Sequence, residues 1–302
     1  MDRLTLRQLR YFDALTRYGH FGRAADACAV TQPALSMQIK ELEDTLGVPL
    51  IDRSARQVRL TEFGEEAAAS VRDILRAVDE LSGLARASHE QLSGRFRIGM
   101  IPTIAPYLLP AFIGDLARAY PQVDMNVREA ITPKLIQELS EGRLDAAIVA
   151  LPVSETSLTE VALFRENFVF VRPAGEERAP VPDAQALREM KLLLLEEGHC
   201  FRDQALAFCN MRALVPRNAL DANSLSTLVQ MVGAGLGVTL IPDMAVPLET
   251  RAASVCVSRF ADPQPSRTIG MVWRKASPLA RPLLQICDVL RQSAAKLHGQ
   301  HA

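Results

Sequence analysis

The hydrophobic pattern changes its period close to Arg95, and this change constrains the fold more than any other feature of the sequence. Before that point, apolar residues such as Leu6, Leu9 and Phe12 recur at helical spacing, which indicates amphipathic helices. Beyond it, short apolar runs such as residues 96–101 alternate with helical segments. Alternating strands and helices are typical of a mostly parallel sheet. The sequence therefore predicts a helical N-terminal part followed by an α/β part.

The N-terminal part has the pattern of a helix-turn-helix. Two short helices, over residues 4–18 and around Ala24, precede a third helix that begins near Thr31. Pro33 falls in the first turn of this third helix, where a proline is well tolerated. In a helix-turn-helix the start of the last helix enters the major groove, where polar side chains contact bases or phosphates. We expect DNA contacts from Thr31, Gln32, Pro33, Ser36, Gln38 and Lys40.

A basic hairpin is predicted over residues 50–61. Arg53, Arg56 and Arg59 face a single nearby acid, Asp52. As the wing of a DNA-binding domain these arginines would contact phosphates, which gives affinity rather than sequence choice. The alternative is a solvated turn, which is the usual role of a run of charges. Because the formal net charge of the whole chain is only -1, any nucleic-acid site must be local.

Residues 64–90 contain no proline and predict one long helix. Ala67, Val71, Ile74, Val78, Leu81 and Ala85 alternate steps of four and three. This heptad seam favours pairing with a partner helix. The alternative is a long helix that packs within its own chain.

The α/β part begins with the order strand, helix, strand, helix, strand over residues 95–150, with later strands predicted at 168–172, 191–195, 237–242 and 268–273. Parallel sheets bind ligands beyond the carboxyl ends of their strands. Thr103 and Thr132 follow the first two strands and would lie at that edge. Two subdomains joined near residues 166 and 267 would leave a cleft, with Cys200 on it.

Two of the five cysteines, Cys200 and Cys209, lie nine positions apart. In one helix they would be about 13.5 Å apart at ~1.5 Å per residue, whereas a disulfide requires Cα atoms within about 7 Å. A helix and a disulfide therefore exclude each other here, and oxidation would rebuild the segment. His199 and Arg202 are cations that would favour a thiolate at Cys200. The alternative is a pair of buried, inert cysteines.

The cysteine count excludes some classes of protein. Five cysteines without regular spacing do not form the framework of a secreted disulfide-rich protein.

The N-terminus has no apolar signal core, and no apolar run approaches the ~18 residues of a membrane span. We expect a cytoplasmic protein without a membrane partner. No CxxC or HxxxH pair suggests a metal, and no cofactor is expected. Cys28, Cys256 and Cys287 match no motif and are expected to be structural.

Segments 21–25 (FGRAA), 31–36 (TQPALS), 38–39 (QI), 42–47 (LEDTLG) and 61–64 (TEFG) resemble the N-terminal signature of the LysR-type transcriptional regulators. The resemblance implies an α/β chain with a winged helix-turn-helix at 1–65 and a linker and dimerisation helix at 66–92. It implies a periplasmic-binding-protein-like effector module at 93–302. Subdomain I would cover 93–166 and 268–302, and subdomain II would cover 167–267.

Segments 101–103 (IPT), 107–110 (YLLP), 196–205 (EEGHCFRDQA), 208–209 (FC) and 267–270 (RTIG) are similar to the OxyR-type hydrogen-peroxide sensors of that family. This resemblance implies that Cys200 is the peroxidatic thiol and Cys209 the resolving thiol of a reversible disulfide. A thiolate attacked by peroxide becomes a sulfenic acid, which a second thiol converts to a disulfide. Arg267 would keep Cys200 ionised. The implied peroxide pocket consists of Thr103, Thr132, His199, Asp203 and Arg267.

The resemblance further implies a non-enzymatic activator of oxidative-stress genes that acts as a homodimer or homotetramer. Its partners would be promoter DNA, hydrogen peroxide, RNA polymerase and a cellular thiol reductant. Two alternatives remain open from the sequence. One is a LysR-type regulator that responds to a small organic molecule in the cleft, and the other is an enzyme, a thiol peroxidase.

Overall fold

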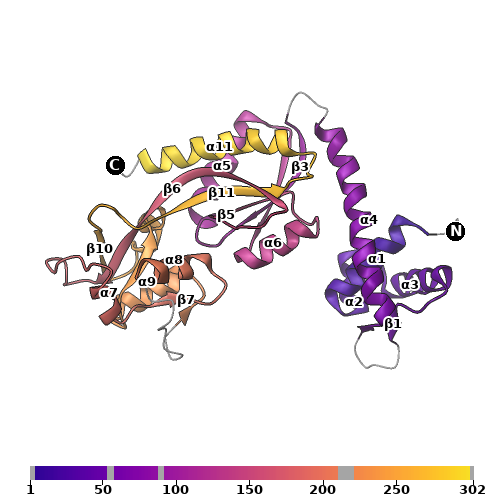
Figure 1. Cartoon of the computed structure of the whole chain (residues 1–302), viewed down its shortest axis with the longest axis horizontal. Coiled ribbons are helices and arrows are strands. Elements are labelled where there is room, and N and C mark those ends of the chain that lie inside the picture. Colours follow the sequence, from indigo (N-terminus) through magenta and orange to yellow (C-terminus); the bar gives the residue numbers. More distant parts are fainter. Residues whose placement is uncertain (1–3, 53–57, 88–91, 210–220, 300–302) are drawn as a thin grey trace. The chain divides into compact units, whose positions relative to one another are not determined.

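The structure of the protein, a computed structural model, describes residues 4–52, 58–87, 92–209 and 221–299 (Figure 1). The chain divides into two compact units, residues 1–85 and 86–302. The first unit has one hydrophobic core and the second unit has two. Each unit is described by itself.

The N-terminal unit is a winged helix-turn-helix, as predicted. Its elements are α1 (Leu6–Tyr18), α2 (Phe21–Ala27), α3 (Gln32–Leu46), β1 (Ile51–Asp52), β2 (Arg59–Leu60) and α4 (Glu62–Ala87). Strands β1 and β2 pair antiparallel. The core of the unit includes Phe12, Leu15, Leu35 and Ile39, which come from α1 and α3 and are almost fully buried. Burial of this shared apolar surface fixes α3 against α1.

The long helix α4 buries only part of its predicted heptad seam within the N-terminal unit. Val71 is buried against the core of the unit. Further along α4, Ile74, Leu81 and Leu84 are 43%, 68% and 58% exposed. These apolar side chains are therefore available to a partner helix, and the pairing itself stays a prediction.

The second unit is built on a seven-stranded sheet with the order β10-β6-β11-β5-β3-β4, and β9 pairs with β6. The predicted alternation is confirmed over β3 (Gly94–Met100), α5 (Ala105–Ala119), β4 (Val123–Glu129), α6 (Thr132–Ser140) and β5 (Ala146–Leu151). Strand β3 lies between β4 and β5 and is parallel to both.

The prediction of a mostly parallel sheet is wrong beyond these three strands. Strands β6 (Leu158–Pro173) and β11 (Ser266–Arg274) pair antiparallel with each other, and β5, β9 and β10 also join them antiparallel. The reason is the path of the chain, because β6 leads away from the first three strands and β11 returns to them. Together β6 and β11 form a long two-stranded ribbon, which passes through the whole second unit (Figure 1). Strand β6 extends well beyond the predicted 168–172, since its first half mixes polar and apolar residues.

The remaining elements surround the far end of the ribbon, except for the last helix, which packs on α5. They are α7 (Ala186–Glu189), β7 (Leu194–Leu195), α8 (Cys200–Phe208), β8 (Asp221–Ala222), α9 (Leu225–Gly233), β9 (Thr239–Pro242), η1 (Asp243–Ala245), α10 (Val246–Glu249), β10 (Val255–Arg259) and α11 (Ala280–Gly299). The strand expected at 191–195 is only the short β7, which pairs with β8.

Two hydrophobic cores lie along the ribbon. The first core includes Phe96 and Phe112, and the second core includes Phe168 and Phe170. Tyr107 packs against both cores, and its hydroxyl donates a hydrogen bond of 2.6 Å to the Glu249 carboxylate. The two cores are therefore joined by both backbone and side chains.

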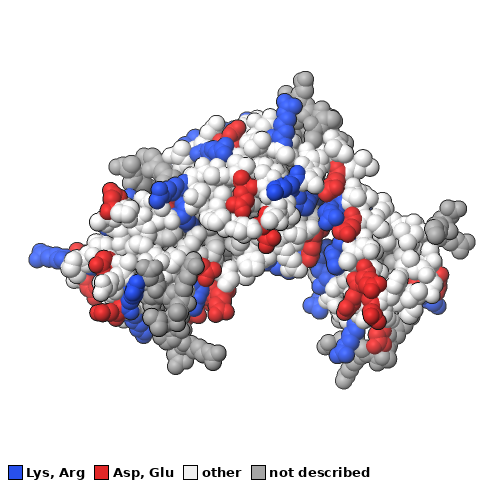
Figure 2. Space-filling view, in the orientation of Figure 1, with Lys and Arg blue, Asp and Glu red and all other residues white. Residues whose placement is uncertain are grey.

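The visible face of the second unit carries Lys and Arg intermixed with Asp and Glu rather than sorted by sign (Figure 2). Such a surface provides no single-sign field that would draw DNA onto this face. Among the helices that the structure describes, none is long and apolar enough to cross a membrane.

A buried carboxylate connects α3 to the wing. Glu43 Oε1 accepts hydrogen bonds from the backbone N–H of Leu50 at 2.9 Å and of Ile51 at 3.1 Å. We expect Glu43→Ala to destabilise the N-terminal unit by about 1–3 kcal/mol, because it leaves buried donors without an acceptor. Hydrogen exchange of the full-length chain should show faster exchange at the Leu50 and Ile51 amides. Asp44→Ala, at an exposed position of α3, is the matched control, and unchanged protection in Glu43→Ala would contradict the prediction.

Candidate functional site

A cleft of about 440 Å³ opens between the two cores of the second unit. One wall comes from the start of α6 and the segment after β5, and the other comes from the start of α8. The cleft is lined by Thr132, Pro133, Ile136, Val153, Glu155, Gly198, Cys200 and Asp203. The predicted cleft is therefore present, and Cys200 lies on it.

Cys200 is the first residue of α8, and a glycine sets the turn that precedes it. Gly198 has φ of +93°, and a Cβ on it would meet Ile131 Cδ1 at 2.8 Å. Glycine satisfies both restrictions, because it tolerates positive φ and has no side chain. The half-buried Cys200 thiol lies in the first turn of a helix, where free N–H groups and the helix dipole favour an anion.

Cys209 is at the opposite end of the same helix. It forms the C-cap of α8, and its carbonyl oxygen accepts a 2.7 Å hydrogen bond from Arg188 Nε. Its side chain is fully buried, and this burial raises the pKa of the thiol to about 11. A helix of this length separates the two cysteines by about 13.5 Å along its axis. All five cysteines are free thiols, so the structure shows the reduced state.

The two cations expected beside Cys200 do not provide free positive charge. Burial lowers the pKa of His199, so its imidazole is neutral at neutral pH. Arg202 donates from Nη1 to the Leu195 carbonyl at 2.7 Å and pairs with Asp221 at 2.8 Å. We expected both residues to activate the Cys200 thiol by their positive charge. Arg202 does not fit this expectation, because Asp221 already balances its charge. His199 does not fit it either, because burial disfavours its protonated form.

Arg267 lies in a buried polar cluster with two partners. Its guanidinium pairs with the Glu166 carboxylate at 2.7 Å, and both side chains are fully buried. It also donates to Thr103 Oγ1 at 2.8 Å and to the Thr103 carbonyl at 3.0 Å. The guanidinium packs 5.4 Å from the centre of the Phe201 ring. Since Glu166 neutralises Arg267, the cluster contributes position and packing more than net charge to the neighbourhood of Cys200.

Sequence reasoning missed Glu166 and Phe201. Glu166 pairs in register with Arg267 across β6 and β11, which only the strand register reveals. Phe201 follows Cys200 in the chain and packs edge-on against Phe168, with ring centres 4.9 Å apart. The cleft-lining residues Pro133, Ile136, Val153 and Glu155 were missed as well, since side chains of this kind carry no local signal.

The predicted peroxide pocket is thus divided into two groups. Thr132, Cys200 and Asp203 line the cleft, whereas Thr103 and Arg267 form the buried cluster. Neither threonine caps a helix through its side chain. Thr132 Oγ1 is buried and, within the described residues, has no hydrogen-bond partner. An unsatisfied buried hydroxyl favours a ligand that can bond to it.

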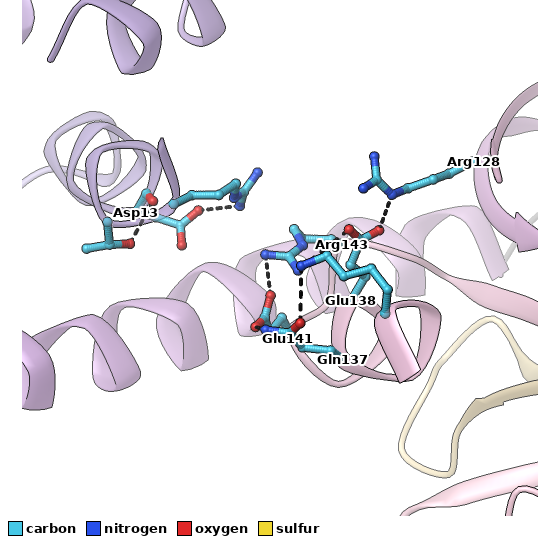
Figure 3. A network of polar contacts seen from close by, with 9 residues as sticks. Asp13, Arg128, Gln137, Glu138, Glu141 and Arg143 are labelled. Carbon is cyan, nitrogen blue, oxygen red and sulfur yellow. Dashed lines mark hydrogen bonds and ion pairs between the residues drawn. The ribbon is translucent and has the colours of Figure 1, made fainter. Parts of the chain in front are cut away.

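A surface network anchors α6, which carries Thr132 and Ile136. Arg128 Nε pairs with Glu138 at 2.6 Å, while Arg143 lies 3.8 Å from Glu138 and pairs closely with Glu141 (Figure 3). The network ties β4, α6 and the turn after α6 together. The cleft wall formed by the start of α6 is therefore held in place from the opposite end of the helix.

The predicted DNA-contacting residues of α3 run from its N-cap to its middle, and one described residue lies on the wing. Thr31, Gln32, Pro33 and Lys40 are exposed, and Ser36 and Gln38 are half-buried. Thr31 is the N-cap of α3, although its side chain makes no capping hydrogen bond, which leaves its hydroxyl available. Arg59 is exposed in β2. Arg53 and Arg56 lie outside the described residues.

Both units match known protein families. Residues 6–65 match the family described as bacterial regulatory helix-turn-helix protein, lysR family, and residues 89–295 match the LysR substrate binding domain. The chain belongs to the LysR family.

Relatives of this LysR-family chain match it over nearly its whole length. The hydrogen peroxide-inducible genes activator of Dickeya chrysanthemi is 42% identical over 294 residues, covering 96% of this chain and 95% of the relative. The DNA-binding transcriptional dual regulator OxyR of Escherichia coli is 41% identical, with 95% of each chain covered. A solved full-length OxyR variant from Pseudomonas aeruginosa superposes with a TM-score of 0.74 at 38% identity, with 96% of each chain covered.

The Glu166–Arg267 pair predicts a non-additive mutational response. We expect Arg267→Met or Glu166→Leu alone to destabilise the second unit by about 3–5 kcal/mol, because each leaves an uncompensated buried charge. The double variant should recover most of this loss, since it removes both charges. Urea unfolding of the four proteins in reducing buffer measures the coupling, and additive losses would contradict a buried ion pair. Arg259, whose pair with Asp243 is exposed, provides the control through Arg259→Met.

The lowered pKa of His199 predicts a pH dependence of stability. The unfolded chain protonates this histidine near its ordinary pKa of about 6.5, while the folded protein resists protonation until lower pH. The unfolded state therefore binds more protons below about pH 6.5, and stability is lost as the pH falls through that value. We expect His199→Gln to make this acid-side loss shallower in urea unfolding. An NMR titration that placed the pKa of His199 at or above its ordinary value would contradict the prediction.

Proposed function

We propose that this LysR-family protein is a DNA-binding transcription activator that senses hydrogen peroxide through a reversible Cys200–Cys209 disulfide. The observation that carries the proposal is the placement of the two thiols at opposite ends of α8, with Cys200 on the cleft and Cys209 buried. The full-length similarity to hydrogen peroxide-inducible genes activators supports the same function. A solved OxyR mutant from Corynebacterium glutamicum, 34% identical to this chain, is described as bound to hydrogen peroxide.

The first chemical step takes place at Cys200. The thiolate sulfur attacks one peroxide oxygen, so that an S–O bond forms, the O–O bond breaks, and hydroxide leaves and becomes water with one proton. Sulfur is thereby oxidised to sulfenic acid. The Thr132 hydroxyl, which has no partner among the described residues, can donate a hydrogen bond to the leaving oxygen, which carries the developing charge. Thr103 and Arg267 would shape the surroundings of this step through the cluster that packs on Phe201, and His199 would do so as the residue that precedes Cys200.

The second step requires α8 to open. The Cys209 thiol must condense with the sulfenic acid and release water, but its Cα must first move from about 13.5 Å to within about 7 Å of that of Cys200. Opening α8 withdraws Phe201, Ala205 and Leu206 from the second core. Oxidation would thus change the surface of the effector unit and the relation between paired DNA-binding units, whose half-sites lie about one helical turn apart.

The DNA side of the proposal rests on the winged helix-turn-helix. Exposed Gln32 and Lys40 on α3 and exposed Arg59 on the wing would contact promoter bases and phosphates, together with the other predicted residues of α3 and the wing. The exposed Ile74 and Leu81 of α4 would pair with a second copy, giving the homodimer from which a homotetramer is built. RNA polymerase and a cytoplasmic thiol reductant, which resets the disulfide, complete the proposed partners.

A regulator that binds a small organic ligand is the second candidate, and the cleft of about 440 Å³ favours it. This volume lies within the range of small-molecule sites. Such a regulator would respond to its ligand irrespective of the state of its thiols. A thiol peroxidase is disfavoured, because the resolving thiol is buried with a pKa raised to about 11, which slows repeated turnover.

We expect Cys200→Ser to abolish the transcriptional response to hydrogen peroxide and Cys209→Ser to leave a sulfenic acid that dimedone traps at Cys200. Peptide mapping after a brief, near-stoichiometric peroxide pulse, with free thiols blocked, should find the Cys200–Cys209 link only in the wild type. Cys256→Ser, on β10 and outside the cleft, is the matched control and should behave as the wild type. A peroxide response that persists in Cys200→Ser would overturn the proposal in favour of a cleft ligand.

A further inference from the structure

The cleft beside Cys200 is much larger than hydrogen peroxide requires. A molecule with two oxygen atoms occupies roughly twice the ~30 Å³ share of a water molecule, whereas the cleft measures about 440 Å³. We infer that Cys200 also reacts with uncharged alkyl hydroperoxides, whose alkyl group lies along the apolar wall of this cleft. The inference rests on the proposed function of Cys200 and extends the class of oxidant that it senses.

The side chains of the cleft are arranged for such a molecule. Pro133, Ile136 and Val153 form an apolar wall, and Thr132 provides a buried hydroxyl that has no hydrogen-bond partner in the part of the chain that the structure describes. Hydrogen peroxide has no apolar part, so this wall would offer it nothing to bind. An alkyl group would remove both its own apolar surface and that of the wall from water, which favours binding.

The charges at the cleft select against anionic oxidants. Glu155 and Asp203 line the cleft and are both exposed, so their carboxylates lie near its opening. Two negative charges repel a peroxide that carries a carboxylate of its own. An uncharged alkyl hydroperoxide experiences no such repulsion.

The geometry of the reaction fits the same cleft. The Cys200 sulfur attacks the terminal oxygen of the hydroperoxide in line with the O–O bond, so the alkyl group points away from the sulfur. The S–O bond forms and the O–O bond breaks. The alkoxide leaves and takes up one proton to become an alcohol, and Thr132 can donate a hydrogen bond to it. Sulfur is oxidised to sulfenic acid, the peroxide is reduced, and condensation with Cys209 releases water.

The test compares tert-butyl hydroperoxide with hydrogen peroxide on the full-length protein, with oxidation of Cys200 followed by stopped-flow and by peptide mapping. We expect both peroxides to oxidise the wild type at Cys200. Ile136→Trp, which fills the apolar wall, should lower the ratio of the tert-butyl hydroperoxide rate to the hydrogen peroxide rate by about tenfold, as expected when a pocket no longer fits an alkyl group. Val153→Trp, on another part of the wall, should shift the ratio in the same direction.

Lys134→Trp is the matched control. It adds the same indole to an exposed position of α6 that does not line the cleft, so both rates should remain as in the wild type. A variant that fails to fold would react with both peroxides at the slow rate of an ordinary exposed thiol, and circular dichroism identifies it. The other wall variant then provides the result.

The outcomes separate the inference from the proposed function. If hydrogen peroxide oxidises Cys200 and tert-butyl hydroperoxide does not, the inference is overturned and the proposed function stands. If both react but neither wall variant changes the ratio, the alkyl group does not use this cleft, and the inference is also overturned. If neither peroxide oxidises Cys200, the proposed function fails together with the inference.

Discussion

The buried ion pair between Glu166 and Arg267 connects the two strands that join the two cores of the second unit. The two residues are partners across β6 and β11, the strands through which the chain passes from the first core to the second and back. A buried charge is tolerated only where its partner and hydrogen bonds are in place, so this pair fixes the ribbon at that point. Through Thr103 and Phe201 the same guanidinium links the end of β3 to the start of α8. These contacts fix the start of α8, and with it Cys200, relative to β6 and β11.

The sequence predicts much of this architecture because local signals agree with the fold. Gly19 adopts a left-handed conformation where the helical pattern ends, and Pro33 lies in the first turn of α3. The nine-residue interval between Cys200 and Cys209 proves to span one helix, α8. These features depend on a few neighbouring residues, and short-range backbone preferences determine them.

What the sequence could not predict depends on register and burial. The first half of β6 mixes polar and apolar residues and has no clear strand period, so the hydrophobic pattern does not reveal the antiparallel strands of the sheet. Arg202 forms an ion pair with Asp221, and Arg267 forms one with Glu166. The partners are far apart in the chain, so the sequence gives no sign that these charges are balanced. Likewise, the neutrality of His199 follows from its burial to 8% exposure. Sequence neighbours suggested a cationic environment for Cys200, whereas tertiary packing removes most of that charge and leaves the helix N-terminus as the local source of positive potential.

In the proposed mechanism, the rate at which Cys200 is oxidised and the rate at which the disulfide forms are controlled by different parts of the structure. The first step needs only access to the Cys200 thiol, which lies on the cleft. The second step must wait until α8 opens, and burial of Phe201 and Leu206 opposes this opening by about 1.5–3 kcal/mol for each side chain. Until then the Cys209 thiol stays buried and protonated, with its pKa raised to about 11. In the proposed mechanism the cleft therefore sets which oxidant is detected and how fast, while the packing of α8 sets how readily the sulfenic acid becomes a disulfide.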